Sequence, residues 1–262
     1  MKTTFILGTD AWVISVVLFI VMVSTTILGM RVAAMRKKRH MEIGVTSKVA
    51  DTNYLTGLFF FLLAFTFGMS GTRFDSRRKV VVEEANIIGT AILRSDLYSP
   101  EERTMFRKDF LEYVEQRIAF YTAATDVEKI LEAEKRSGEV SAKLWARAMK
   151  LSHDPAYLQA TLLMTPALNA MIDITTTRFY GEKAKVPESI LWMLFALACI
   201  NSFFSGYSAT LKGTHDWLVE IGFCLLVSVV ILFTLDIDRP RRGFVTLDGA
   251  NQTILELRNH FR

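Results

Sequence analysis

Four long runs of hydrophobic residues are separated by polar stretches along the chain. The runs are Ala11–Met30, Thr52–Thr72, Ser189–Leu211 and Trp217–Leu235. The first three contain no charged side chain, and the fourth contains only Glu220, near one end. A helix of about 20 residues, rising ~1.5 Å per residue, crosses the hydrocarbon core of a bilayer. The runs therefore predict four transmembrane helices.

The polar residues between the second and third runs have helical periodicity throughout. Ser99 and Pro100 give an N-cap followed by a proline at the first helical position, and Asp154 with Pro155 predicts the start of a further helix. Apolar residues after Pro100 recur at helical spacing, and no stretch alternates with a period of two. We therefore expect an α-helical extramembrane domain here.

These patterns predict an all-α membrane protein with four transmembrane helices and a helical domain inserted between the second and third. The expected parts are residues 1–72, the first two transmembrane helices with a basic connecting loop; 73–188, the helical bundle; 189–238, the last two transmembrane helices; and 239–262, a polar tail. The first apolar run is too long for a signal peptide, so we expect it to be retained.

Composition agrees with a membrane protein, because 51% of the residues are hydrophobic and 22% are charged. The net charge of +4 comes from basic residues that cluster beside the apolar runs, which favours contact with lipid headgroups or ions over nucleic acid. With both termini in the cytoplasm, more Lys and Arg residues would lie on the inner side of the membrane. Arg36 to Arg39, in the first connecting loop, oppose this orientation.

No sequence motif supports an enzyme, a cofactor or a metal site. The four histidines stand singly at His40, His153, His215 and His260. The acid pairs Glu83–Glu84 and Glu101–Glu102 point to different faces of a helix, and such pairs are usually solvated or salt-bridged. Phosphate-binding glycine loops and hydrolase motifs do not occur.

The stretch from Tyr54 to Asp96 passes from apolar to charged residues without a proline, so one helix is expected to continue from lipid into water. Its words GLFFFLLAFTFGMSGTRFDSRR and EEANIIGTAILRSDL, with DIDRPRRGFV far downstream, resemble the bestrophin-like family of bacterial membrane proteins. The resemblance covers nearly the whole chain. It implies a location in the bacterial inner membrane and a more distant similarity to bestrophin ion channels.

The similarity to the channels implies an oligomer, a pentamer, that conducts inorganic anions such as chloride. In bestrophins five copies of one helix line the pore, and bulky apolar side chains at four-residue spacing form a narrow neck. Alignment on Arg73 and Phe74 implies that the neck positions are Gly57, Phe61 and Phe65. Gly57 departs from the family's bulky pattern, which leaves the width of the neck at that level in doubt.

The residues themselves permit the same arrangement. A four-residue step keeps Phe61 and Phe65 on one helix face, so parallel copies could stack two aromatic collars that block ions by dewetting. After the collars comes a group of basic residues that would form a ring at the pore entrance and attract anions. The group is Arg73, Arg77, Arg78 and Lys79.

Other interpretations remain open at this point. Phe61 and Phe65 fit a lipid-facing or core position equally well, and the basic group fits anchors to anionic headgroups or ion pairs with Glu83 and Glu84. A non-conducting membrane scaffold that binds partners through its helical domain is the alternative function.

Three further positions are expected to hold the helices together. Gly68 and Gly71 predict a close packing seam or a hinge, and Asn201 predicts burial within the bundle, because an amide is costly in lipid. Pro240 ends the fourth span, and the charged residues around it, Asp236, Asp238, Arg239, Arg241 and Arg242, predict an acid–base clamp on the tail.

Overall fold

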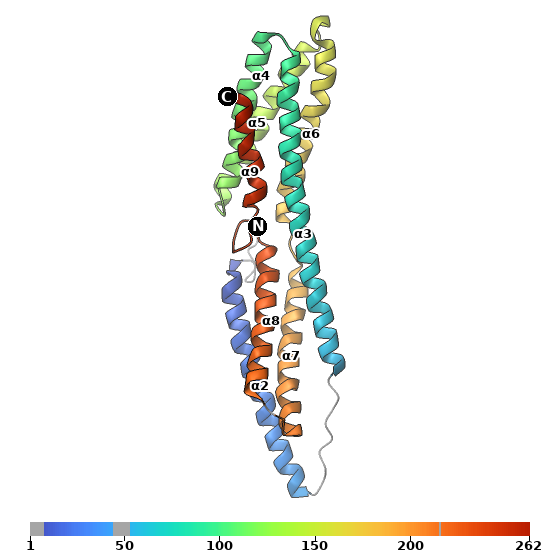
Figure 1. The fold of residues 1–262 in the computed structure, drawn as a ribbon, viewed down its shortest axis with the longest axis vertical. Helices are drawn as coiled ribbons and strands as arrows, with labels where there is room; N and C mark the ends of the chain where they lie inside the picture. The colour runs from blue at the N-terminus through green and yellow to red at the C-terminus, as the bar shows by residue number, and fades with distance from the viewer. Residues whose placement is uncertain (1–7, 44–52, 215) are drawn as a thin grey trace. The chain divides into compact units, whose positions relative to one another are not determined.

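The computed structural model of the chain describes residues 8–43, 53–214 and 216–262. Those residues form α-helices joined by short turns and 3-10 helices, and no strand occurs among them (Figure 1). The chain divides into two compact units. Unit 1 combines residues up to Arg73 with Lys185–Arg239, and unit 2 combines Phe74–Ala184 with Pro240–Arg262.

Unit 1 contains the four apolar helices. They are α2 (Ala11–Ile43), the first part of α3 (Asn53–Arg94), α7 (Glu188–Lys212) and α8 (Trp217–Ile237). Each of the four predicted runs overlaps a helix that is long and apolar enough to cross a membrane. Helices α2, α7 and α8 run side by side, and their buried side chains form one core around Met22, Leu194 and Ile231 (Figure 1).

The closest helix contact in unit 1 joins α2 to α7 at two glycines. A Cβ atom on Gly29 would lie 2.1 Å from the carbonyl oxygen of Phe203, and one on Gly206 would lie 2.4 Å from that of Thr26. The two backbones can approach this closely only because both residues lack a side chain. The predicted seam was therefore misplaced, since a Cβ on Gly68 or Gly71 meets no atom within 4 Å.

Two other features of unit 1 bear on the sequence predictions. Asn201 is buried, accepts a hydrogen bond from the Thr56 hydroxyl at 2.8 Å and donates one to the Leu55 carbonyl at 3.3 Å. The amide thus joins α7 to the start of α3 without an unpaired group in the apolar region. Arg36 to Arg39 lie within α2 and not in a connecting loop, because the helix continues to Ile43.

Unit 2 is a helical bundle. It contains the second part of α3, η1 (Ser95–Leu97), α4 (Pro100–Thr122), α5 (Val127–Leu151), η2 (Pro155–Tyr157), α6 (Leu158–Lys183), α9 (Asp248–Glu256) and η3 (Leu257–Phe261). The Asp154 side chain caps η2 by accepting a bond from the Ala156 backbone N–H. Ser99 occupies the N-cap of α4 but makes no side-chain cap bond.

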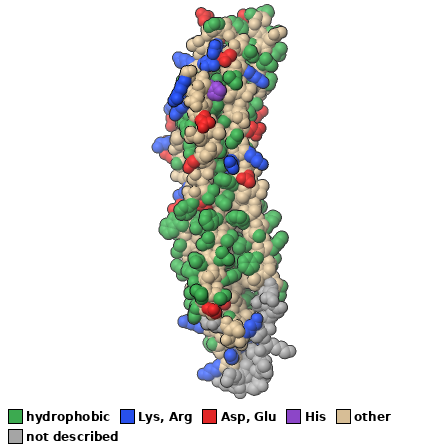
Figure 2. Space-filling model, in the orientation of Figure 1, with side chains coloured by type: hydrophobic (Ala, Val, Ile, Leu, Met, Phe, Trp, Pro, Cys, Tyr) green, Lys and Arg blue, Asp and Glu red, His purple; other side chains and the backbone are tan. Residues whose placement is uncertain are grey.

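The C-terminal tail is part of the core of unit 2. Leu247, Ile254 and Leu257 are buried among residues of α3 and α4, including Ile88 and Phe110. The two units also differ in their surfaces. Hydrophobic side chains crowd the visible surface of unit 1, whereas charged side chains are scattered over that of unit 2 (Figure 2). A large exposed apolar surface of this kind suits contact with lipid.

Candidate functional site

Helix α3 presents two stripes of opposite character, one buried and one exposed. The buried stripe in unit 1 contains Phe59 and Leu63 but also the hydroxyl residues Thr66 and Ser70. Thr66 satisfies its hydroxyl within the helix by donating to the Leu62 carbonyl at 2.7 Å. The helix therefore buries small polar residues while larger aromatic ones stay outside.

Phe61 and Phe65 lie on the exposed stripe. Their exposed fractions are 65% and 56%, and their rings stack with centroids 6.4 Å apart and planes 20° apart. Gly57, one turn earlier, is also exposed and has no neighbour within 4 Å of an added Cβ atom. A position in the core of the subunit is therefore excluded for both phenyl rings, which leaves lipid or another protein copy as the neighbour.

The exposed stripe continues along α3 beyond the apolar region, at alternating steps of three and four residues. Its members after Phe65 are Gly68, Thr72, Asp75, Lys79, Val82 and Asn86, and all are exposed. A spacing of 3.5 residues per turn keeps one face of a helix toward a neighbouring helix. Polar and small residues on a face that also carries two phenyl rings are unusual for a surface covered only by lipid.

The four predicted basic residues do not form one exposed group. Arg77 is buried, and its guanidinium donates to the carbonyl oxygens of Gly181, at 3.2 Å, and Ala184. Arg73 forms an ion pair of 3.6 Å with Asp238. For Arg77 the prediction of a pore-entrance position is wrong, because the end of α6 takes its hydrogen bonds.

Arg78 and Lys79 are exposed and line a shallow groove of about 390 Å³ with Asp75, Val82, Glu83 and Asn86. Within the part of the chain that the structure describes, no ion pair joins Lys79 to Glu83. The groove contains two cations and two acids, so it is electrically mixed.

Glu84 points into unit 2, away from the basic residues of α3. Its carboxylate accepts from Arg117 Nε at 2.6 Å and from the guanidinium of Arg178. Arg117 also donates to Glu134 at 2.8 Å, and Arg178 donates to Asn251 at 2.7 Å. The side chains of Glu84 and Arg117 are 0% exposed. Ion pairs between Glu84 and the basic residues 73–79 are therefore not formed.

This buried cluster surrounds one aromatic ring. The guanidinium carbons of Arg117, Arg178 and Arg241 lie 4.6, 5.4 and 4.4 Å from the centroid of Phe120. Burial alone would lower the pKa of Arg117, but the negative charge of Glu84 outweighs it and raises that pKa above its usual value. The ring and the carboxylates together hold three cations inside the bundle.

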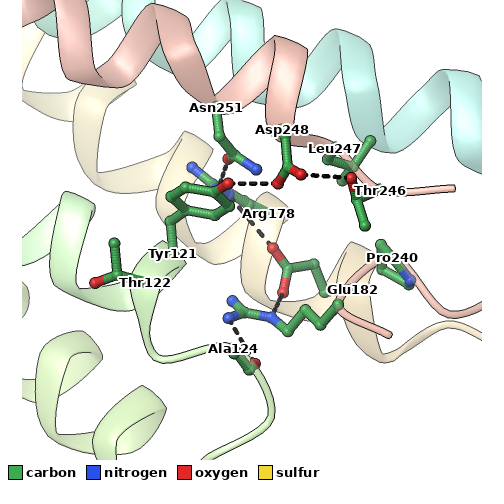
Figure 3. Close-up of a pocket in the computed structure, with 11 residues that line it drawn as sticks. Tyr121, Thr122, Ala124, Arg178, Glu182, Pro240, Thr246, Leu247, Asp248 and Asn251 are labelled. Carbon is green, nitrogen blue, oxygen red and sulfur yellow. Dashed lines mark hydrogen bonds and ion pairs between the residues drawn. The ribbon is translucent and has the colours of Figure 1, made fainter. Parts of the chain in front are cut away.

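A pocket of about 260 Å³ lies beside this cluster, between α4, α6 and the tail (Figure 3). Arg241 from the tail donates to Glu182 at 2.6 Å, and Tyr121 donates to Asp248. Burial and the Asp248 carboxylate raise the pKa of Tyr121 to about 12, while the Tyr121 hydrogen bond lowers that of Asp248. The charged groups of the pocket thus pair with one another and hold the tail on the bundle.

Other charged residues near Pro240 act in unit 1. Asp238 accepts a hydrogen bond from the Val186 backbone N–H at 2.8 Å, and Arg239 donates to the Thr9 carbonyl. The acid–base clamp expected around Pro240 is present in this form. Its partners, in α6 and at the ends of helices, are distant in sequence. Among the described residues, no group of three or more metal-ligating side chains is close enough to hold an ion.

The chain was compared with protein-family models, curated proteins and solved structures. The model of the bestrophin-like domain matches residues 16–250. In the comparison with curated proteins, none matched. A bacterial bestrophin homolog from Klebsiella pneumoniae has a TM-score of 0.70 and 12% identity, covering 92% of this chain and 97% of that one. Two variants of that homolog have TM-scores of 0.67 and 0.69 at 13% and 12% identity, covering 95% and 94% of this chain and 99% and 97% of theirs.

Proposed function

Because the chain belongs to the bestrophin-like family, we propose that it assembles as a homopentamer in the bacterial inner membrane and conducts anions. In this proposal α3 from each copy lines a central pore, and the bundle between the second and third transmembrane helices stands outside the membrane. The fold of the Klebsiella pneumoniae homolog supports the architecture, since the two chains match over nearly their full lengths.

The observation that carries the proposal is the inverted polarity of α3. The helix buries Thr66 and Ser70 inside the subunit and leaves Phe61 and Phe65 outside, on a stripe that continues into Thr72 and beyond. A stripe that changes from aromatic to polar along one face suits a passage that is dry at one level and wet at the next. In a ring of parallel copies, the two phenyl rings of each copy make two collars around the axis.

The collars would act as the gate. An apolar constriction too narrow for liquid water stops ions, and a small tilt or rotation of each helix widens it. Gly57 leaves the level before Phe61 wide. The stacked arrangement of Phe61 and Phe65 couples the two collars, because the rings move with one helix.

Anion preference would come from Arg78 and Lys79, the exposed cations on this part of α3. Asp75 and Glu83 lie within one helical turn of them and reduce the field, so we expect a modest preference for chloride over sodium. Replacing Lys79 by Gln should reduce the preference. The reversal potential in a chloride gradient measures it, and a wild-type value at the sodium potential would contradict anion selectivity.

Single-channel recording of the purified protein in planar bilayers tests conduction. The variant Phe61→Ala with Phe65→Ala should conduct more often or at higher current than the wild type, because its collars no longer exclude water. Phe67→Ala is the matched control: Phe67 is an exposed aromatic residue of α3, but at ~100° per residue it lies roughly 120° to 160° around the helix from the two rings. Absence of current in both wild type and the double variant would refute the proposal.

A non-conducting scaffold is the second candidate, because unit 2 also exposes leucines. Leu93 and Leu97 near the end of α3, and Leu162 and Leu163 on α6, are each at least half exposed. Partners or neighbouring copies could cover such residues. Electron-microscopy images of the protein in detergent separate the two functions, since a monomer or dimer supports the scaffold and a closed ring supports the channel.

A further inference from the structure

A groove of about 450 Å³ lies in unit 1 where α2, α7 and α8 leave the apolar region. Its lining residues are Met30, Arg31, Ala34, Thr210, Gly213 and Trp217. Met30 is the last residue of the first charge-free run, Gly213 ends α7 in a left-handed turn with φ 73°, and Trp217 is the first residue of α8. All three elements thus change from apolar to polar at this groove, as helices do at a membrane surface.

Arg31 is the only charged residue among those that line the groove in the described structure. Its side chain is exposed and has no hydrogen bond or ion pair with the described residues. The acids nearest in sequence are engaged: Asp216 caps the Leu218 N–H at 2.9 Å, and Glu220 accepts from Ser205 at 3.0 Å. A guanidinium in this setting presents its donors to an anion from outside the protein.

Further basic residues follow on the same helix. Lys37, Lys38 and Arg39 are exposed, whereas Arg36 donates to the Tyr207 hydroxyl at 2.6 Å. Figure 2 shows Lys and Arg side chains gathered at one end of the apolar surface of unit 1. Basic residues next to a transmembrane helix attract anionic lipids, each contributing about 1 kcal/mol near the surface.

We propose that this groove binds an anionic phospholipid, with the phosphate on Arg31, the glycerol region against the Trp217 ring and the acyl chain along Met30 and Ala34. The groove combines one unpaired cation, an aromatic ring of the interfacial type and an apolar wall, which is the order of chemical groups along a phospholipid. The site lies on α2, α7 and α8 and does not depend on conduction through α3.

Titration of the purified full-length protein in detergent with dioctanoyl phosphatidylglycerol and dioctanoyl phosphatidylcholine tests the site, with thermophoresis as the readout. The wild type should prefer phosphatidylglycerol. Arg31→Ala should weaken that binding by about five-fold, the equivalent of about 1 kcal/mol, and leave phosphatidylcholine binding unchanged. Arg31→Lys should retain most of the preference, and unchanged far-UV circular dichroism shows that the variants are folded.

Arg39→Ala is the matched control, because Arg39 is an exposed basic residue of α2 outside the groove. Equal losses in Arg31→Ala and Arg39→Ala would show diffuse attraction by the basic helix and overturn the proposal. Displacement of the lipid by millimolar inorganic phosphate would identify a free-anion site instead and would also overturn it. The absence of any preference for phosphatidylglycerol in the wild type would have the same consequence.

Discussion

Glu84→Gln should destabilise the protein strongly, because it removes the carboxylate between two buried guanidiniums. Glu84 and Arg117 are 0% exposed and Arg178 is 3% exposed, so water cannot replace the lost charge. Glu134 still pairs with Arg117, but the cluster is left with one excess positive charge. Breaking a buried ion pair by removing one partner costs about 3–5 kcal/mol.

Thermal unfolding of the full-length protein in detergent, followed by circular dichroism, measures the effect. At roughly 2–4 °C per kcal/mol, the midpoint should fall by at least about 6 °C. Glu115→Gln is the matched control, because Glu115 pairs with Arg258 but the two side chains are 42% and 45% exposed. Exposed pairs contribute no more than about 1 kcal/mol. Equal midpoints for the two variants would show that burial of the cluster does not stabilise the fold.

Three other substitutions test the packing of the helices and the tail. Gly29→Ala should reduce the yield of folded protein in size-exclusion chromatography, because the Cβ atom meets the Phe203 carbonyl at 2.1 Å, whereas Gly68→Ala should be tolerated. Asn201→Leu should lower the unfolding midpoint by leaving the Thr56 hydroxyl unpaired; an unchanged midpoint would contradict the role of the amide. Asp248 has a lowered pKa, so its stabilisation of the tail is complete above about pH 4 and is lost as the pH falls through the folded value; limited proteolysis of the tail should increase there, and in Asp248→Asn at neutral pH.

The sequence predicts the helices well because their signals are local. Each apolar run long enough to cross a bilayer overlaps a suitable helix, and Asp154 with Pro155 does begin a helical segment. The polar residues Tyr54 to Asp96 likewise fall almost entirely in one continuous helix and its 3-10 extension, as the lack of a proline indicates.

The faces of α3 could not be predicted, because their polarity is the reverse of the usual one. Large aromatic residues such as Phe61 normally indicate a core position, and hydroxyl residues such as Ser70 an exposed one. Here the hydroxyl residues are small enough for close packing, and Thr66 satisfies its hydrogen bond within the helix, so they are the ones buried.

The partners of the charged residues were also hidden, since they lie far away in sequence. Arg77 bonds a carbonyl more than 100 residues later, at Gly181, and Glu84 finds Arg178 in the same distant helix. The true glycine seam at Gly29 and Gly206 has no local feature that distinguishes it from other glycines in apolar runs. Only the fold brings these pairs together.

A reconstruction of the assembled protein in lipid nanodiscs, with side-chain density along α3, tests the central claim most directly. The account predicts a closed ring of copies in which Phe61 and Phe65 of every subunit face the symmetry axis and narrow it at two successive levels. Phenyl rings that contact acyl chains, or a particle without a shared axis, would contradict it.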